Sequence, residues 1–117
     1  MVVEIVSDEE VDRIFHALAD STRRDIVSQV IQREQSVSEL ARRYAMSFAA
    51  VQKHVMVLER AALVTKERRG REQIVHGNLT TVHKAARLLD EYEGVWLARA
   101  QSISEILADS NREEIGP

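Results

Sequence analysis

The sequence predicts a mainly α-helical fold that carries one small β-hairpin. Helix breakers are rare, because the single proline is the last residue and glycines occur only at positions 70, 77, 94 and 116. Ser7 with Glu10 and Ser36 with Glu39 have the capping-box spacing that opens helices. The hydrophobic period changes from helical to alternating in "LVTKERRGREQIVHG", which predicts the hairpin.

The first helix is expected to begin after Ser7 and the second after Asp20, which is a favourable N-cap residue. Apolar residues recur at helical spacing in both segments, so each helix has one face for a core. In the first helix these residues are Val11, Ile14, Phe15 and Leu18. In the second helix they are Ile26, Val27, Val30 and Ile31.

Two shorter helices and the hairpin follow. Ser36 opens a helix that ends near Tyr44, and Ser47 caps the next one. The apolar face of this fourth helix consists of Val51, Val55, Leu58 and Ala62. Val64 and residues 74–75 then read as strands, joined by a turn at "RRGR" in which Gly70 supplies the conformational freedom.

The last helix is expected from about Leu79 to Ala108, which is roughly 45 Å at 1.5 Å per residue. A domain of this size is too small to cover such a helix, so its apolar residues need a partner surface. They are Val82, Leu88, Leu89, Tyr92, Val95, Trp96, Ile103, Ile106 and Leu107. We favour a dimer in which this long helix and the first helix form the contact between the two copies. The alternative is that the segment forms two shorter helices folded back on the domain. Gly94 marks either a kink or a close approach of two helices.

The chain is therefore expected to form one domain over residues 1–110, in which residues 1–20 and 79–110 are terminal dimerisation helices. Residues 111–117 are polar and are expected to be a disordered tail.

Charge is distributed unevenly along the 117 residues, whose formal net charge is −3. Residues 1–20 hold one Arg against six acids, residues 21–76 eleven Lys/Arg against six acids, and residues 77–117 four against seven. A basic middle segment suits a surface that binds phosphate, because affinity depends on the local face rather than the sum. Uneven charge also arises by chance on surface helices.

Missing residue types exclude several kinds of function. There are no cysteines, which removes disulfides, thiolate metal sites and thiol redox sensing. No enzyme is expected, because the sequence has no phosphate-cradling glycine loop and no His paired with a carboxylate at ligand spacing. No apolar run approaches the roughly 18 residues of a membrane span, and the start "MVVEIVSDEE" is unlike a secretory signal. We therefore expect a cytoplasmic protein without a membrane partner.

The predicted order, an earlier helix pair, two short helices and a hairpin, is that of a winged helix-turn-helix. In this arrangement the second helix of the motif enters the major groove of double-stranded DNA and the hairpin reaches along the backbone. The outer side of the fourth helix carries small, amide and cationic side chains, which suit base edges and phosphates. The predicted DNA-binding residues there are Ser47, Phe48, Ala49, Gln52, Lys53 and His54. On the hairpin they are Arg68, Arg69 and Arg71.

Some of these assignments have alternatives. Phe48 either contacts a thymine methyl group or fills a local part of the core. The hairpin arginines either bind phosphates or pair with Glu67 and Glu72 on a solvated hairpin. The alternative function is a winged helix that binds protein or RNA without an operator, and the positive reading face favours DNA over this alternative.

The resemblance to a known family rests on two segments, "FHALADSTRRDIV" and "SVSELARRYAMSFAAVQKHVMVLERAALVTKERRGREQIV". They resemble the ArsR/SmtB family of bacterial winged-helix repressors, over about Ile14 to Val75, and the long terminal helix matches the family's dimerisation element. The resemblance implies a homodimer that binds a palindromic operator, represses transcription and releases DNA when an effector binds. It also implies that Arg68 to Arg71 lie on the wing and that the reading helix carries Ser47, Phe48, Ala49, Gln52, Lys53 and His54.

The metal sites of this family do not carry over. At the start of the third helix the family has cysteines, whereas this chain has Ser36 and Ser38, and hydroxyls are poor ligands for arsenic, cadmium or lead. The last helix has only His83 near its start; its carboxylates are Asp90, Glu91, Glu93 and Glu105. No metal or cofactor is therefore expected, and the effector is left open. A zinc or nickel site that combines His16, His76 or His83 with acids remains an alternative.

Overall fold

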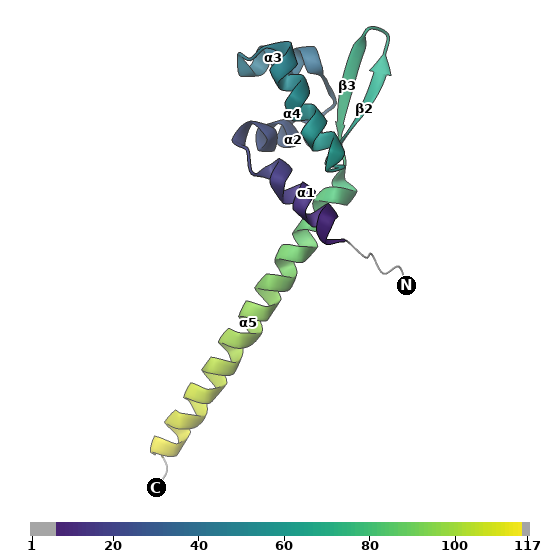
Figure 1. Cartoon of the computed structure of the whole chain (residues 1–117). Coiled ribbons are helices and arrows are strands. Elements are labelled where there is room, and N and C mark those ends of the chain that lie inside the picture. Colours follow the sequence, from purple (N-terminus) through teal and green to yellow (C-terminus); the bar gives the residue numbers. More distant parts are fainter. Residues whose placement is uncertain (1–6, 116–117) are drawn as a thin grey trace. The chain divides into compact units, whose positions relative to one another are not determined.

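The computed structural model describes residues 7–115, of which 112–115 are described by their backbone only. In chain order the elements are α1 (Asp8–Leu18), α2 (Ser21–Gln32), β1 (Gln35–Ser36), α3 (Val37–Tyr44), α4 (Phe48–Arg60), β2 (Val64–Arg69), β3 (Glu72–Gly77) and α5 (Leu79–Ile115). Figure 1 shows these helices together with the hairpin of β2 and β3. The predicted fold class, mainly α with a small β-hairpin, is confirmed. The chain divides into two compact units, residues 1–85 and residues 86–117.

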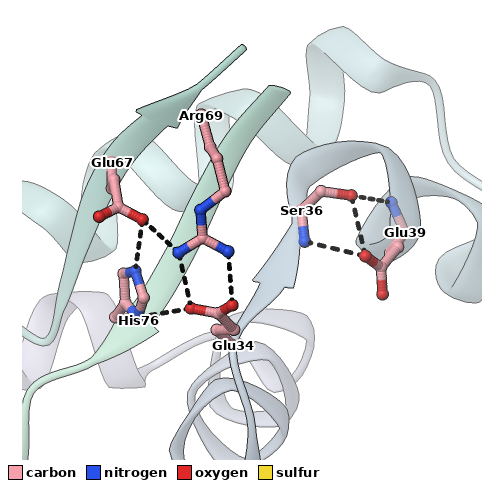
Figure 2. Close-up of polar contacts among 6 residues, drawn as sticks. All are labelled: Glu34, Ser36, Glu39, Glu67, Arg69 and His76. Carbon is pink, nitrogen blue, oxygen red and sulfur yellow. Dashed lines mark hydrogen bonds and ion pairs between the residues drawn. The ribbon is translucent and has the colours of Figure 1, made fainter. Parts of the chain in front are cut away.

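The first four helices begin where their cap residues predict. In each case a side-chain oxygen accepts a hydrogen bond from a backbone N–H in the first turn, and the caps are Ser7, Asp20, Ser36 and Ser47. The Ser36 hydroxyl accepts from the Glu39 amide at 3.1 Å, and the Ser36 amide donates to Glu39 Oε1 at 3.5 Å (Figure 2). This reciprocal capping box satisfies two backbone donors, and a cap of this kind contributes about 1 kcal/mol.

The sheet has a third strand that the sequence analysis missed. The strand order is β1-β3-β2, and both pairs are antiparallel. In β1, Gln35 pairs with Val75 and Ser36 with Ile74. A strand of two residues is too short to show an alternating pattern, so only the pairing reveals it.

The core of the first unit joins the inner faces of α1–α4 to the strands. Its buried apolar residues are Ile14, Ala17, Ile26, Val27, Val30, Val37, Leu40, Val51, Val55, Leu58, Ala61, Leu63, Val64, Val75 and Ala85. Three residues that the helical spacing assigned to inner faces are exposed instead: Phe15, Ile31 and Ala62. Ala62 follows the end of α4 with a left-handed φ of 59°, so that Ala61 and Leu63 turn inward in its place.

Two glycines serve the hairpin in different ways. Gly70 has a φ of +66° at the turn between β2 and β3, where a side chain would be strained. Gly77 ends β3 against α2, and a Cβ atom there would lie 2.7 Å from Cγ1 and 3.0 Å from Cα of Ile31. The close approach of β3 to α2 therefore requires the absence of a side chain at this position.

The second unit consists of the remainder of α5. The helix is continuous through Gly94 and extends to Ile115, beyond the expected end near Ala108, so the alternative of two shorter helices is wrong. Residues 111–115 of the expected tail belong to this helix. Residues 1–6 of the expected first dimerisation segment and residues 116–117 of the tail lie outside the described residues. Within the described residues, no helix combines the length and apolar character needed to cross a membrane.

Replacing Gly77 by Ala is expected to lower the free energy of unfolding by about 1–3 kcal/mol, because the new Cβ meets the backbone of Ile31. Urea denaturation followed by circular dichroism measures this change. Gly94→Ala is the matched control, since its Cβ meets nothing within 4 Å and Ala favours a helix by up to about 1 kcal/mol. Wild-type stability in Gly77→Ala contradicts the inferred close approach.

Candidate nucleic-acid interface

The helix α4 has one fully buried face and one open face. Val51, Val55 and Leu58 are each 0% exposed, which fixes the rotation of the helix about its axis. The predicted reading residues therefore lie on the other side: Ser47, Phe48, Ala49 and Lys53 are exposed, and Gln52 and His54 are half-buried. The structure brings five of the six to the outer side at the N-terminal end of one helix, whereas His54 turns toward Arg23 and Asp20 at the corner between α1 and α2.

Phe48 is 48% exposed at the first position of α4. An aromatic ring that is half in solvent does not fill a core, so the interpretation of Phe48 as a local core plug is wrong. Ser47 immediately before it is the N-cap and accepts from the Ala50 amide at 3.1 Å. The first turn of α4 therefore presents an apolar ring and a capped helix N-terminus on the same exposed end.

His54 is oriented by the corner between α1 and α2. Its Nδ1 lies 3.4 Å from Nη1 of Arg23 and 4.0 Å from Oδ2 of Asp20. The same Arg23 donates from Nε to the carbonyl of Ala17 at 2.7 Å. The backbone amide of Arg23 in turn is the main reason that the pKa of Asp20 is lowered. His54 thus attaches α4 to the end of α1 through Arg23. The same Arg23 side chain caps α1 by donating to its last carbonyl groups.

The turn between α3 and α4 is held by a second polar contact. Tyr44, the last residue of α3, donates its hydroxyl to Asp25 Oδ2 on α2 at 2.5 Å, and Arg43 Nε donates to the same oxygen at 3.3 Å. The Tyr44 bond is the largest cause of the lowered pKa of Asp25. Burial, followed by this bond, raises the pKa of Tyr44 to about 12. Because Ala45 then turns with a left-handed φ of 51°, the chain enters α4 in a fixed direction.

The hairpin arginines differ in their partners. Arg68 donates from Nε to the carbonyl of Gly70 at 3.3 Å, which folds it back over the turn. Arg71 is exposed and makes no hydrogen bond or ion pair with the other residues that the structure describes. Arg69 is paired, as the alternative interpretation of the hairpin expected, although Glu72 is not one of its partners within the described residues.

Arg69 donates to both oxygens of Glu34, at 2.7 Å and 3.2 Å, and also to Glu67 (Figure 2). The Glu34 hydrogen bond is the main cause of the raised pKa of Arg69, and it lowers the pKa of Glu34. His76 lies against both carboxylates, with Nδ1 3.4 Å from Glu34 and Nε2 3.5 Å from Glu67. Sequence reasoning missed Glu34, because nothing in its local pattern distinguishes it from any exposed acid after a helix.

Glu34, Glu67 and His76 also form a group that could hold a metal ion, since one ligand atom from each lies within 4.8 Å of the others. His16 and His83, the other histidines considered for a metal, belong to no such group in the part of the chain that the structure describes.

Comparison with known proteins agrees with this arrangement. A family model described as "Helix-turn-helix domain" matches residues 18–67, which include α2, α3, α4 and the start of the hairpin. The chain is 42% identical over 71 residues to the uncharacterized HTH-type transcriptional regulator YuzN of Bacillus subtilis, covering 55% of this chain and 77% of that protein. It is 41% identical over 63 residues to the HTH-type transcriptional regulator Rv2034 of Mycobacterium tuberculosis, covering 54% of this chain and 59% of that protein.

A solved structure extends the similarity beyond the helix-turn-helix. The ArsR-like transcriptional regulator from Rhodococcus sp. RHA1 superposes with a TM-score of 0.72 at 33% sequence identity. The match covers 84% of this chain and 92% of that chain.

Replacing Asp25 by Asn is expected to lower stability at neutral pH by about 1 kcal/mol, a value discounted because the carboxylate is partly exposed. Since the pKa of Asp25 is lowered in the folded state, its contribution is present above the ordinary value of 3.8 and is lost as the pH falls below it. The variant should therefore show a flatter loss of stability as the pH falls below 3.8. Denaturation across this range measures the effect. Tyr44→Phe should flatten the same limb, and an unchanged acid profile in both variants argues against the Tyr44–Asp25 bond.

Proposed function

The chain belongs to the ArsR family of winged helix-turn-helix transcriptional regulators, and on this premise we propose that it is a homodimeric repressor that binds a palindromic operator on cytoplasmic DNA. The observation that carries the proposal is the open face of α4, next to a basic wing. The helix buries Val51, Val55 and Leu58 completely. The side chains on its opposite side do not belong to the core and are open to a binding partner.

The open face of α4 has the chemistry of a major-groove reader. The side-chain amide of Gln52 can form hydrogen bonds with both groups that adenine presents in the major groove, its amino group and N7. The ammonium group of Lys53 can bond guanine or a phosphate. Ala49 is small enough for close approach, and the exposed ring of Phe48 suits a thymine methyl group. Ser47 and the N-terminus of α4 suit a phosphate. His54 supports this face from the side, through its contacts with Asp20 and Arg23, and contributes to the phosphate contact.

The wing supplies contacts that are independent of sequence. Arg68, Arg69 and Arg71 surround the turn at Gly70, where their long side chains can reach phosphates beside the groove. The surplus of eleven basic over six acidic residues in positions 21–76 favours approach of this unit to DNA despite the net negative charge of the chain.

The second unit suits pairing with a second copy of the chain. Its exposed apolar residues include Leu89, Tyr92, Trp96, Ile103 and Ile106, which follow one another at steps of three, four, seven and three residues. This is the spacing of a seam between two helices. On α1, Phe15 is 36% exposed and supports the contribution of that helix to the dimer. Two copies related by a two-fold axis then present two reading helices about one DNA turn, or roughly 34 Å, apart.

The operator is found by pull-down of genomic DNA with the purified protein, followed by sequencing. Recovery of a shared palindromic site supports the proposal. Recovery of RNA or protein partners without any preferred DNA site contradicts it and favours the alternative of an interaction module.

With the operator in hand, Gln52→Ala and Arg71→Ala should behave differently. Loss of a base contact reduces discrimination between operator and random DNA by about 1–3 kcal/mol. Loss of a phosphate contact weakens binding to both and reduces the slope of log K against log salt by about 1. Fluorescence anisotropy at several salt concentrations measures both quantities. Arg13→Ala, which removes an exposed cation from α1, is the control. Equal effects of the two substitutions on both DNAs contradict the division of roles.

Trp96→Glu is expected to convert the dimer to a monomer at micromolar concentration, because it introduces a charge into the centre of the apolar seam. Ala98→Glu places the same charge on an exposed position of α5 outside the seam and should leave the dimer intact. Sedimentation velocity compares the two variants with the wild type. A monomeric wild type ends the dimer proposal, and a dimeric Trp96→Glu ends the assignment of the seam.

A further inference from the structure

The base of the wing holds a cluster in which three potential metal ligands come from three separate segments. Glu34 follows α2, Glu67 is on β2 and His76 is on β3, and one ligand atom from each lies within 4.8 Å of the others. The antiparallel pairing of β2 with β3 and the approach of α2 to β3 bring these segments together. None of the three residues belongs to the reading face of α4.

This cluster already binds a cation, namely the guanidinium group of Arg69. Figure 2 shows that group between the two carboxylates, with His76 against both. Arg69 contacts both oxygens of Glu34 and the same oxygen of Glu67 that lies 3.5 Å from His76. The two carboxylates are therefore arranged around a positive charge that the protein itself provides.

The donor set has a definite preference among metal ions. Two carboxylates and one imidazole, without any thiolate, suit divalent ions such as Zn²⁺, Co²⁺ and Ni²⁺ rather than soft ions. Ligand atoms around a tetrahedral ion with bonds of 2.0–2.1 Å are about 3.4 Å apart. Since the separations of the three atoms reach up to 4.8 Å, the atoms must approach one another by up to about 1.4 Å. The glutamate side chains, 43% and 49% exposed, have room for that movement.

We propose that Glu34, Glu67 and His76 form a site for a divalent transition-metal ion, and that the ion displaces Arg69 from the carboxylates. Metal and guanidinium are both cations and require the same oxygen atoms, so they exclude one another. The displaced Arg69 stands directly before the turn of the wing, where a phosphate is the next available anion. The consequence for DNA rests on the proposed function: metal should strengthen binding to DNA by returning a wing arginine to it.

Titration of the purified protein with Zn²⁺ by calorimetry, and with Co²⁺ by visible absorption, tests the site without DNA. One ion per chain is expected, with affinity at least about tenfold weaker in Glu67→Gln and in His76→Gln. Arg69→Ala removes the competing cation, so it should bind metal about fivefold more tightly than the wild type. His83→Gln is the control, because this exposed histidine on α5 lies outside the cluster.

The results separate the proposal from an ordinary surface site. Absence of binding below millimolar metal, or equal weakening in His83→Gln and His76→Gln, overturns the site. Arg69→Ala with wild-type or weaker affinity overturns the displacement. Circular dichroism of each metal-free variant checks that it is folded. Glu67→Gln and His76→Gln remove different ligands, so each tests the metal site independently.

The effect on DNA is measured with a random duplex, so that no operator is required. Saturating Zn²⁺ should tighten wild-type binding several-fold and raise the salt slope by about 1, and a chelator should reverse both changes. His76→Gln and Arg69→Ala should show no such response. If the wild type binds no DNA under any condition, the proposed function fails while the metal titration stands. If it binds DNA without a response to metal, the inferred coupling alone is overturned.

Discussion

The short pairing of β1 with β3 joins the two parts of the interface. Ser36 is 1% exposed and has two roles, since its backbone lies opposite Ile74 in the sheet and its side chain caps α3. The first residue of the helix-turn-helix is thereby attached to the strand that forms one side of the wing. The close approach of Gly77 to Ile31 attaches the C-terminal end of β3 to α2. With the middle and the C-terminal end of β3 held, the base of the wing keeps a fixed position relative to α2 and α3.

The orientation of α4 follows from burial rather than from any contact of its outer residues. Three apolar side chains at helical spacing reach zero exposure, and this leaves the opposite side in solvent whatever residues occupy it. The polar contacts of Tyr44 and His54 then fix the direction and depth of the helix without using its open face. The buried side chains therefore hold α4 rigidly, and the exposed side chains determine what it can bind. Residues on the exposed side can be substituted without changing the orientation of the helix.

Most of the fold could be predicted from the sequence, because helix caps, apolar spacing and a glycine turn are local signals. The four caps, the hairpin and the open face of α4 all depend on residues a few positions apart. The missed exit of Ala62 from α4 is a local feature, in which the Leu63 amide donates to the Leu58 carbonyl at 3.0 Å. The other missed features depend on pairings that are distant in the sequence, because β1 exists only opposite β3. The exposure of Phe48 and the partners of Arg69 likewise depend on which distant segments lie beside them.

The pairing of Arg69 with carboxylates affects affinity and specificity in different ways. Solvent screens exposed ion pairs, so Glu34 and Glu67 hold the arginine only weakly against the dense negative charge of DNA. Breaking these pairs costs the same for every DNA sequence, because a phosphate contact carries no sequence information. If Arg69 contacts a phosphate as proposed, the carboxylates lower the affinity for operator and random DNA by the same factor and leave the ratio between them unchanged. Under the proposed function that ratio depends on Gln52 and Lys53 on the open face of α4, neither of which pairs with a carboxylate among the residues that the structure describes.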